Sequence, residues 1–276
     1  MTMHAFFRHR LAVGGALITL VVVGAVALNP LLSPYSATEM DFSALLAPPS
    51  FAHPFGTDSF GRDVLTRVLE GARVSLSVSL AGVSAALALG TACGLIAAYR
   101  GGLVDSVTMR VSDLLFSFPS FVLALFLMVV LGFGVVNIAL AIALVYFPIF
   151  ARLARNLGAV VLTEPWVQAA KLFGQSATSI LVREVLPNIA APLLVQATVG
   201  VAFGIVIEAG LSFLGLGVQP PNPSLGTIMA DGREYFGPAP WVITLTGVAI
   251  SVALLGFNLL GDGLRDLSDP KLRRRP

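Results

Sequence analysis

Charged residues are scarce in this sequence. Only 12% of its 276 residues are Asp, Glu, Lys or Arg, whereas 56% are hydrophobic, and the mean hydropathy is +0.88. A soluble domain carries about 25% charged residues. The deficit excludes an ordinary soluble domain and indicates a protein that crosses a membrane several times. The small net charge of +2 gives no reason to expect nucleic acid as a partner.

Residues that bind metals or form disulfides are also few. Cys93 is the only cysteine and lies in an apolar run, which excludes a disulfide framework and a cysteine metal site. The three histidines, His4, His9 and His53, do not have the spacing of zinc ligands. We therefore expect neither a metal nor a cofactor in this chain.

The sequence lacks the short motifs of nucleotide-binding and hydrolytic proteins. Its two lysines, Lys171 and Lys271, do not follow glycine, which excludes a G-x-x-x-x-G-K-[ST] phosphate loop. H-E-x-x-H and G-x-S-x-G are absent as well. We therefore expect a transport subunit rather than an enzyme, driven by a partner chain or by an ion gradient.

Long apolar runs, in contrast, are abundant. Six of them reach or approach the roughly 17–25 residues that a helix needs to span a bilayer, which predicts an all-α protein with six transmembrane helices. The fourth run is short and follows the third through Gly132-Phe133-Gly134, which predicts a tight turn. The runs are Leu11–Leu28, Val74–Ala98, Leu114–Leu131, Val135–Phe150, Leu193–Leu211 and Trp241–Gly261.

The ends of the chain are predicted to lie in the cytoplasm. Lys and Arg concentrate in cytoplasmic segments of membrane proteins, and here only Arg62, Arg67, Arg73 and Arg233 fall on the side opposite the termini. The first run resembles a secretory signal because it follows a basic segment. Its 18 residues exceed the ~7–15 of a signal core, which favours an uncleaved span.

A polar segment between the fourth and fifth runs has a helical pattern. Thr163 is expected to cap a helix that starts at Glu164-Pro165 and ends at Gly174. Ser176 is expected to cap a second helix, which Pro187 ends. The pattern predicts two short amphipathic helices, which either rest on the membrane and the spans or fit a groove in another protein. The apolar stripe of the first helix is Trp166, Ala169, Ala170 and Phe173.

Polar residues also mark the segments on the opposite side. In residues 58–70, Asp58 is expected to cap a helix with Arg62 and Asp63 on its polar face. This helix either lies on the outer membrane surface or docks a partner. Glu208 is the only acidic residue within the predicted spans, which makes it a candidate for a functional site, with a helix-end or packing role as the alternative. Residues 213–240 contain five prolines and are predicted to be irregular.

The polar segment resembles the EAA loop of ABC-importer permeases, E-A-A-x3-G-x9-I-x-L-P. Ala169, Ala170 and Gly174 match the motif, and Leu186-Pro187 follow at the family's spacing. Two positions depart from it, since Gln168 stands in place of the Glu and Glu184 in place of the Ile. In the family this loop forms the coupling helix that fits a cleft in the ATPase subunit.

Three longer stretches resemble the C-type permease subunit of dipeptide, oligopeptide and nickel importers. Together they cover most of the chain and imply the type I importer fold. They are HPFGTDSFGRDVLTRVLEGARVSLSV, EAGLSFLGLGVQPPNPSLGTIMADGREY and FNLLGDGLRDLSDP, which begin at His53, Glu208 and Phe257.

The resemblance implies a subunit of an ATP-driven importer in the bacterial inner membrane. It also implies a second permease, two ATP-binding subunits that use ATP and Mg, an extracytoplasmic binding protein, and membrane lipid around the spans. Peptides are the expected substrate, with nickel chelates, glutathione or opines as alternatives. A secondary transporter driven by an ion gradient is the alternative of another class, but the spans offer almost no ionisable relays for it.

The resemblance also assigns residues to roles. It divides the chain into an N-terminal span and outer loop (1–73), a core with a cytoplasmic coupling loop (74–266 and 151–192), and a basic tail (267–276). The expected gate or binding-protein contacts are Asp58, Arg62, Asp63 and Glu208. The expected ATPase-coupling residues are Trp166, Gln168, Ala169, Ala170, Phe173, Gly174, Leu186 and Pro187.

Overall fold

A computed structural model describes residues 9–268, so most of the basic tail lies outside the described residues. Within that range the regular structure is helical, apart from one antiparallel bridge between Thr57 and Asp63. The helices are α2 (Arg10–Ala27), α3 (Asn29–Leu32), α4 (Val64–Arg100), α5 (Gly102–Phe116), α6 (Ser120–Leu131), α7 (Val135–Leu162), α8 (Pro165–Leu172), α9 (Ala177–Ser179), the π-helical segment η1 (Ile180–Val185), α10 (Leu186–Phe213), α11 (Leu225–Arg233) and α12 (Pro240–Ser268).

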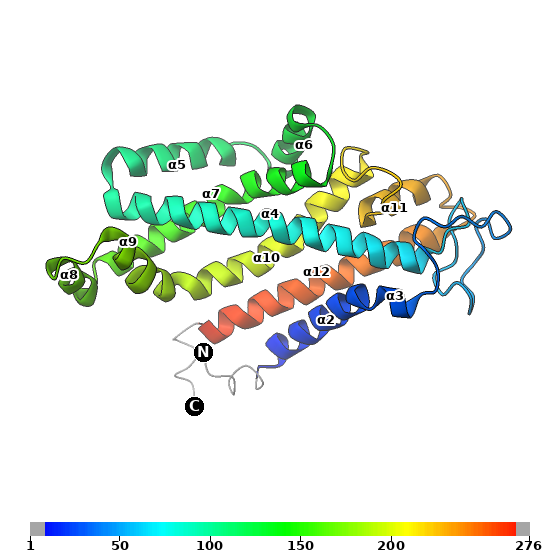
Figure 1. Cartoon of the computed structure of the whole chain (residues 1–276), viewed down its shortest axis with the longest axis horizontal. Coiled ribbons are helices and arrows are strands. Elements are labelled where there is room, and N and C mark those ends of the chain that lie inside the picture. Colours follow the sequence, from blue (N-terminus) through cyan, green and yellow to red (C-terminus); the bar gives the residue numbers. More distant parts are fainter. Residues whose placement is uncertain (1–8, 269–276) are drawn as a thin grey trace.

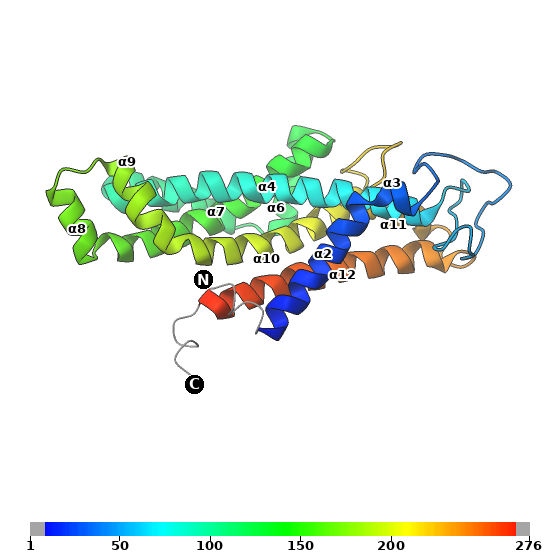
Figure 2. The same cartoon turned by 60° about the horizontal axis from the view of Figure 1, so that its bottom comes forward.

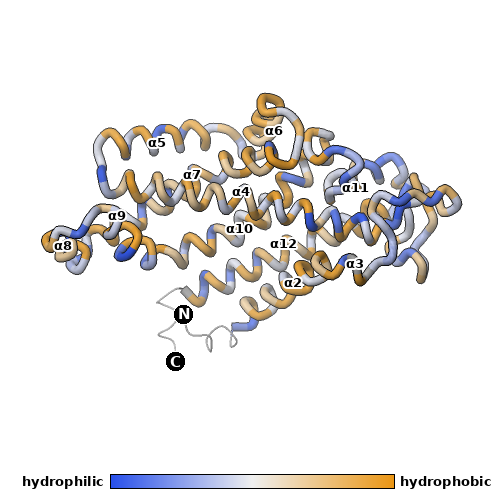
Figure 3. The backbone as a smooth tube through the Cα atoms, viewed as in Figure 1, coloured by the Kyte–Doolittle hydropathy of each residue, from blue (hydrophilic) through white to orange (hydrophobic). Residues whose placement is uncertain are grey.

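The long helices lie side by side along the long axis of the molecule. Figure 1 shows α4, α7, α10 and α12 in this arrangement, with α8 at one end and α11 at the other. Turned by 60°, the structure shows α2 crossing α12 at the edge of the bundle (Figure 2). Hydrophilic residues gather at the two ends, and the middle of the long helices is mainly hydrophobic (Figure 3). This distribution is the one a bilayer requires of a spanning bundle.

Five helices among the described residues are long and apolar enough to cross a membrane, and a bent pair adds a sixth span. The pair is α5 and α6, whose axes differ by 94°. The predicted third run, Leu114–Leu131, therefore covers the end of α5 and the whole of α6 rather than one continuous helix. Pro119 explains the break, because proline lacks a backbone N–H and disfavours helical geometry in the residue before it. The tight turn at Gly132-Phe133-Gly134 is confirmed.

The centre of the bundle is a close contact between α4 and α7. Small residues let two helix backbones approach each other. Gly82, Gly90 and Gly94 of α4 face backbone atoms of α7, and a methyl group added at any of them would overlap a carbonyl of α7. Around this contact the core is filled by fully buried side chains such as Phe150 and Met128.

Helix α4 begins in a different place and environment from those predicted. Asp63, not Asp58, caps it, by accepting a hydrogen bond from Thr66 N at 2.8 Å. The helix then continues without interruption into the membrane span. A separate helix on the membrane surface was wrong, because Val64, Val68 and Arg67 are all buried.

The second polar helix also differs from its prediction. Pro187 does not end it, because α9, η1 and α10 form one continuous helix from Ala177 to Phe213. The six residues of η1 precede the proline, and π-helical turns, although rare, occur mostly as short bulges inside α-helices that continue on both sides. The Asn188 side chain donates to Glu184 O at 2.6 Å, which satisfies one carbonyl of this region.

The proline-rich segment after α10 is not wholly irregular. It contains α11, which starts with a capping box in which Ser224 and Thr227 exchange hydrogen bonds between side chain and backbone. Such a reciprocal cap stabilises the first turn of a short helix. A helix was therefore missed within residues 213–240.

Candidate functional site

At the α11 end, Asp58 organises two buried arginines. The tight turn at Gly61 lets Asp58 Oδ1 accept hydrogen bonds from Phe60 N and Arg62 N, at 2.9 and 3.1 Å. Its other oxygen, Oδ2, accepts from Arg62 Nε at 2.7 Å and from Arg67 Nη1 at 2.5 Å. Buried charges are stable only when they are paired and hydrogen-bonded. The three side chains therefore form a fixed structural unit at the start of α4.

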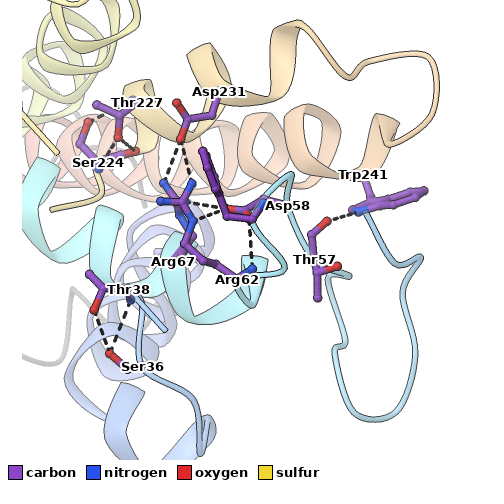
Figure 4. A network of polar contacts seen from close by, with 11 residues as sticks. Ser36, Thr38, Thr57, Asp58, Arg62, Arg67, Ser224, Thr227, Asp231 and Trp241 are labelled. Atoms are coloured by element: carbon purple, nitrogen blue, oxygen red, sulfur yellow. Dashed lines mark hydrogen bonds and ion pairs between the residues drawn. The ribbon is translucent and has the colours of Figure 1, made fainter. Parts of the chain in front are cut away.

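Asp231 of α11 completes this cluster from a distant part of the sequence (Figure 4). Its Oδ2 lies 3.3 Å from Arg62 Nη2 and 3.1 Å from Arg67 Nη2. The Asp231 side chain is 41% exposed, so this half of the cluster faces solvent. Burial raises the pKa of the Asp231 carboxyl, and the neighbouring Arg62 charge opposes that rise. We call Asp58, Arg62, Arg67 and Asp231 the outer ion cluster.

A small pocket opens beside the outer ion cluster. Its volume is about 180 Å³, and its lining combines the two arginines with polar and proline residues of the segment between α10 and α11. Arg62, Arg67 and Asp231 all contribute to the wall. The cluster thus joins the first outer loop to the second.

Asp63 lies next to the cluster but has its own partners. Besides capping α4, it accepts a hydrogen bond or ion pair from His53 Nδ1 at 3.0 Å. The ring of His53 stacks on that of Tyr35, with centroids 4.7 Å apart. Asp63 therefore fixes the outer loop against the start of α4.

Glu208 is fully buried and lies in a separate polar group. Its Oε1 accepts from Ser212 Oγ at 2.7 Å, and its Oε2 accepts from Ser75 Oγ of α4. Ser212 Oγ in turn accepts from Val218 N at 3.1 Å. Glu208 therefore links α4, α10 and the segment that leads to α11.

Helix α11 connects the two polar groups. Gly226 at its start packs against the backbone of Ala209, and Gly71 of α4 packs against Ser224 and Leu225. A side chain at either glycine would overlap backbone atoms of its neighbour. This close contact makes α11 the element that carries Asp231 over the end of α10.

At the opposite end, α8 has a buried face and an exposed face. Val167 and Ala170 are buried against the bundle. Trp166, Leu172 and Phe173 point away from it, with Leu172 89% and Phe173 88% exposed. These side chains give α8 an exposed apolar surface at this end of the molecule.

The predicted stripe of α8 is only partly one surface. Ala169 is half-buried and Ala170 buried, so they pack towards the chain itself, whereas Trp166 and Phe173 face outwards. Gly174 ends the helix with a φ of +77°, as predicted, and Ser176 caps α9. Thr163 was wrong as the cap, because it ends α7 and Glu164 takes the cap position of α8.

The predicted residues thus fall into distinct places. Asp58 and Arg62 come together, Asp63 lies beside them, and Glu208 lies in its own group. Leu186 and Pro187 lie in the first turn of α10, beyond α9 and η1.

The sequence pattern pointed to Arg67 only as a polar residue and did not indicate Asp231. No local signal could have paired them, since 164 positions separate the two.

Family models match this chain over two segments. Residues 90–274 match the model described as the binding-protein-dependent transport system inner membrane component. Residues 1–49 match the N-terminal TM domain of oligopeptide transport permease C.

Curated relatives are similar over nearly the whole chain. The dipeptide transport system permease protein DppC of Alkalihalophilus pseudofirmus is 41% identical, over 96% of this chain and 88% of the relative. The glutathione transport system permease protein GsiD of Pectobacterium atrosepticum is 38% identical, over 97% and 89%. Among solved structures, the inward-facing MetNI methionine ABC transporter has a TM-score of 0.57 at 17% identity, covering 73% of this chain and 96% of that one. This likeness shows a shared fold.

Proposed function

Because the chain belongs to the family of binding-protein-dependent transport system inner membrane components, we propose that it is a permease subunit that imports di- or oligopeptides into bacteria using ATP hydrolysed by partner subunits. The observation that carries the peptide substrate is the 41% identity to a dipeptide permease over 96% of the chain. The match of residues 1–49 to an oligopeptide permease segment supports the same substrate class. Glutathione, itself a peptide, is the second candidate because of the similarity to GsiD.

The proposed complex contains this chain, a second permease, two ATP-binding subunits and an extracytoplasmic binding protein. Both termini and α8 lie on the cytoplasmic side in this proposal, and the outer ion cluster faces the binding protein. The arrangement of arginines and lysines along the sequence supports that orientation. Peptide passes between the two permeases, and the chain itself makes and breaks no bond.

In this proposal α8 is the coupling helix. Its exposed Trp166, Leu172 and Phe173 enter a cleft of an ATP-binding subunit, and covering a large apolar side chain contributes roughly 1.5–3 kcal/mol. When the ATP-binding subunits close, α8 moves with them. The continuous helix Ala177–Phe213 passes that movement towards Glu208 and α11 at the other end. A helix of its 37 residues is about 55 Å long, enough to cross the membrane.

The proposal predicts that Leu172→Ser uncouples the complex. The wild-type complex in proteoliposomes should take up a labelled dipeptide when supplied with ATP and binding protein, and binding protein should stimulate its ATPase. Leu172→Ser should remove most of both activities, because the apolar contact with the ATP-binding subunit is lost. Uptake and phosphate release measured side by side check this.

Leu31→Ser is the matched control, since Leu31 is 83% exposed but lies on α3, towards the other end of the molecule. It should transport normally. Excess unlabelled glutathione or nickel chelate as competitor tests the substrate class. Absence of ATP-dependent dipeptide uptake, with uptake of a labelled nickel chelate under the same conditions, would refute a peptide substrate, and normal coupling in Leu172→Ser would refute the role of α8.

A further inference from the structure

At the corner between α7 and α8, the backbone carbonyl of Leu162 accepts its hydrogen bond from a side chain. Thr163 N donates to Val160 O and Glu164 N to Val161 O, at 3.0 and 3.1 Å. Pro165, the first residue of α8, has no N–H to offer. Leu162 ends α7 and is a buried residue, and a carbonyl that is shielded from water and has no partner is costly.

Gln168 supplies the missing donor. Its side-chain Nε2 donates to Leu162 O at 2.6 Å, reaching back one turn of α8 to the last residue of α7. The backbone N–H of the same residue donates to Glu164 O at 3.1 Å. Gln168 is thus hydrogen-bonded on both sides of the corner.

A glutamate at this position could not replace that bond. A carboxylate at neutral pH has no proton to donate and only accepts hydrogen bonds. The neutral amide of Gln168 satisfies this geometry, and the Glu that the EAA motif carries would oppose it.

The other contacts of α8 with its own chain have little directionality. Val167 and Ala170 pack into the bundle, and Lys171 Nζ lies 5.4 Å from the centre of the Tyr99 ring. Apolar burial is non-directional, so it holds the helix in place without fixing its angle. Two directional hydrogen bonds join the corner, the backbone bond from the cap residue Glu164 to Val161 O and the side-chain bond from Gln168 to Leu162 O; among the described contacts, the second is the one that a helical residue of α8 makes to α7.

We propose that Gln168 is the positioning residue of the coupling helix. Resting on the proposed function, the inference is that its bond to Leu162 O fixes the angle between α7 and α8 and presents Leu172 and Phe173 in one orientation. Gln168 departs from the Glu of the EAA motif and so carries no charge. In the structure its amide instead donates a hydrogen bond to Leu162 O.

The test compares Gln168→Glu and Gln168→Met with the wild type in the complete complex. Both variants keep the length of the side chain and lack the N–H donor. Hydrogen–deuterium exchange of residues 163–175 should rise, because loss of one hydrogen bond changes the population of the fixed orientation roughly 2- to 12-fold. Binding-protein-stimulated ATPase should fall by a similar factor.

Gln175→Glu is the control, because Gln175 is exposed just after α8 and makes only a backbone bond to Ala170 O. It should leave both measurements unchanged. Unchanged exchange in Gln168→Glu, or raised exchange with normal stimulation, overturns the positioning role. Higher stimulation in Gln168→Glu overturns it in favour of a charge effect. If the Leu172→Ser complex keeps normal uptake and normal ATPase stimulation, the coupling role of α8 is overturned. This outcome does not depend on the exchange data.

Discussion

Asp58 pairs with two arginines through a single carboxylate oxygen, and all three side chains are buried. Arg62 Nε and Arg67 Nη1 lie 2.7 and 2.5 Å from Asp58 Oδ2. Removing one partner of a buried ion pair leaves an uncompensated charge, whereas loss of a solvent-facing partner is softened by water. Loss of the Asp58 charge should therefore destabilise the protein more than loss of the Asp231 charge.

Asp58→Asn should lower the free energy of unfolding by about 3–5 kcal/mol, because it leaves two guanidinium groups buried without their main counter-charge. Asp231→Asn should cost clearly less, since that carboxylate is 41% exposed. Thermal unfolding of the protein in detergent measures both. Asp41→Asn, at an exposed position of the same loop, is the control and should change stability by less than about 0.5 kcal/mol. Equal losses at Asp58 and Asp231 would contradict this ranking.

Single residues were predictable from sequence where their signal is local. Gly174 ends α8 because a positive φ favours glycine, and Ser176 caps α9 because its hydroxyl accepts a backbone N–H. Asp58 and Arg62 are four positions apart, within reach of local reasoning. Asp231 was not predictable, because only the packing of α11 on α10 brings it to the arginines.

Helices α4 and α7 meet backbone to backbone at the centre of the bundle. Gly94 lies against the carbonyl of Ala151, with no space for a side chain. Contacts of this type depend on the absence of a single methyl group, and overpacking typically costs 1–3 kcal/mol.

Gly94→Ala should therefore destabilise the protein by about 1–3 kcal/mol, because the added Cβ pushes the two helices apart. Gly14→Ala is its matched control, since Gly14 lies in α2 with open space around it. That substitution should be neutral or stabilising by up to about 1 kcal/mol through helix propensity alone. Unfolding curves of the two variants give the comparison, and a stable Gly94→Ala protein would refute the tight contact.

At the level of elements, the sequence predicted the presence of helices more accurately than the residues at which they end. The apolar runs were found because length and hydropathy suffice for that. Pro119 breaks the third span, whereas Pro187 is absorbed within the first turn of α10. Pro119 stands just before the first residue of α6, whereas Pro187 follows a π-helical segment through which the helix continues, and the sequence did not predict that segment.

Across the whole molecule, α8 and the outer ion cluster lie at opposite ends of the bundle (Figure 1). If the bundle crosses the membrane as proposed, a side chain at one end is accessible from one compartment only. Phe173 at the α8 end and Phe51 in the outer loop are both highly exposed, which makes them suitable probes.

Single cysteines at these positions, in a Cys93→Ser background, should react from opposite sides. A membrane-impermeant maleimide added to intact cells should label Phe51→Cys and leave Phe173→Cys unlabelled, because the proposed orientation, based on the distribution of arginine and lysine, puts α8 inside. Breaking the cells should make both react, which controls for intrinsic reactivity. Labelling of Phe173→Cys in intact cells would reverse the proposed orientation.

The contact of Lys171 with the ring of Tyr99 has a practical consequence. The chain contains only two lysines, and the other, Lys271, lies in the basic tail. An amine-reactive cross-linker can therefore modify only two lysine side chains in this subunit, and its reaction at Lys171 reports on α8. Reaction at Lys171 with and without nucleotide would follow α8 in the native sequence, with no engineered label at all.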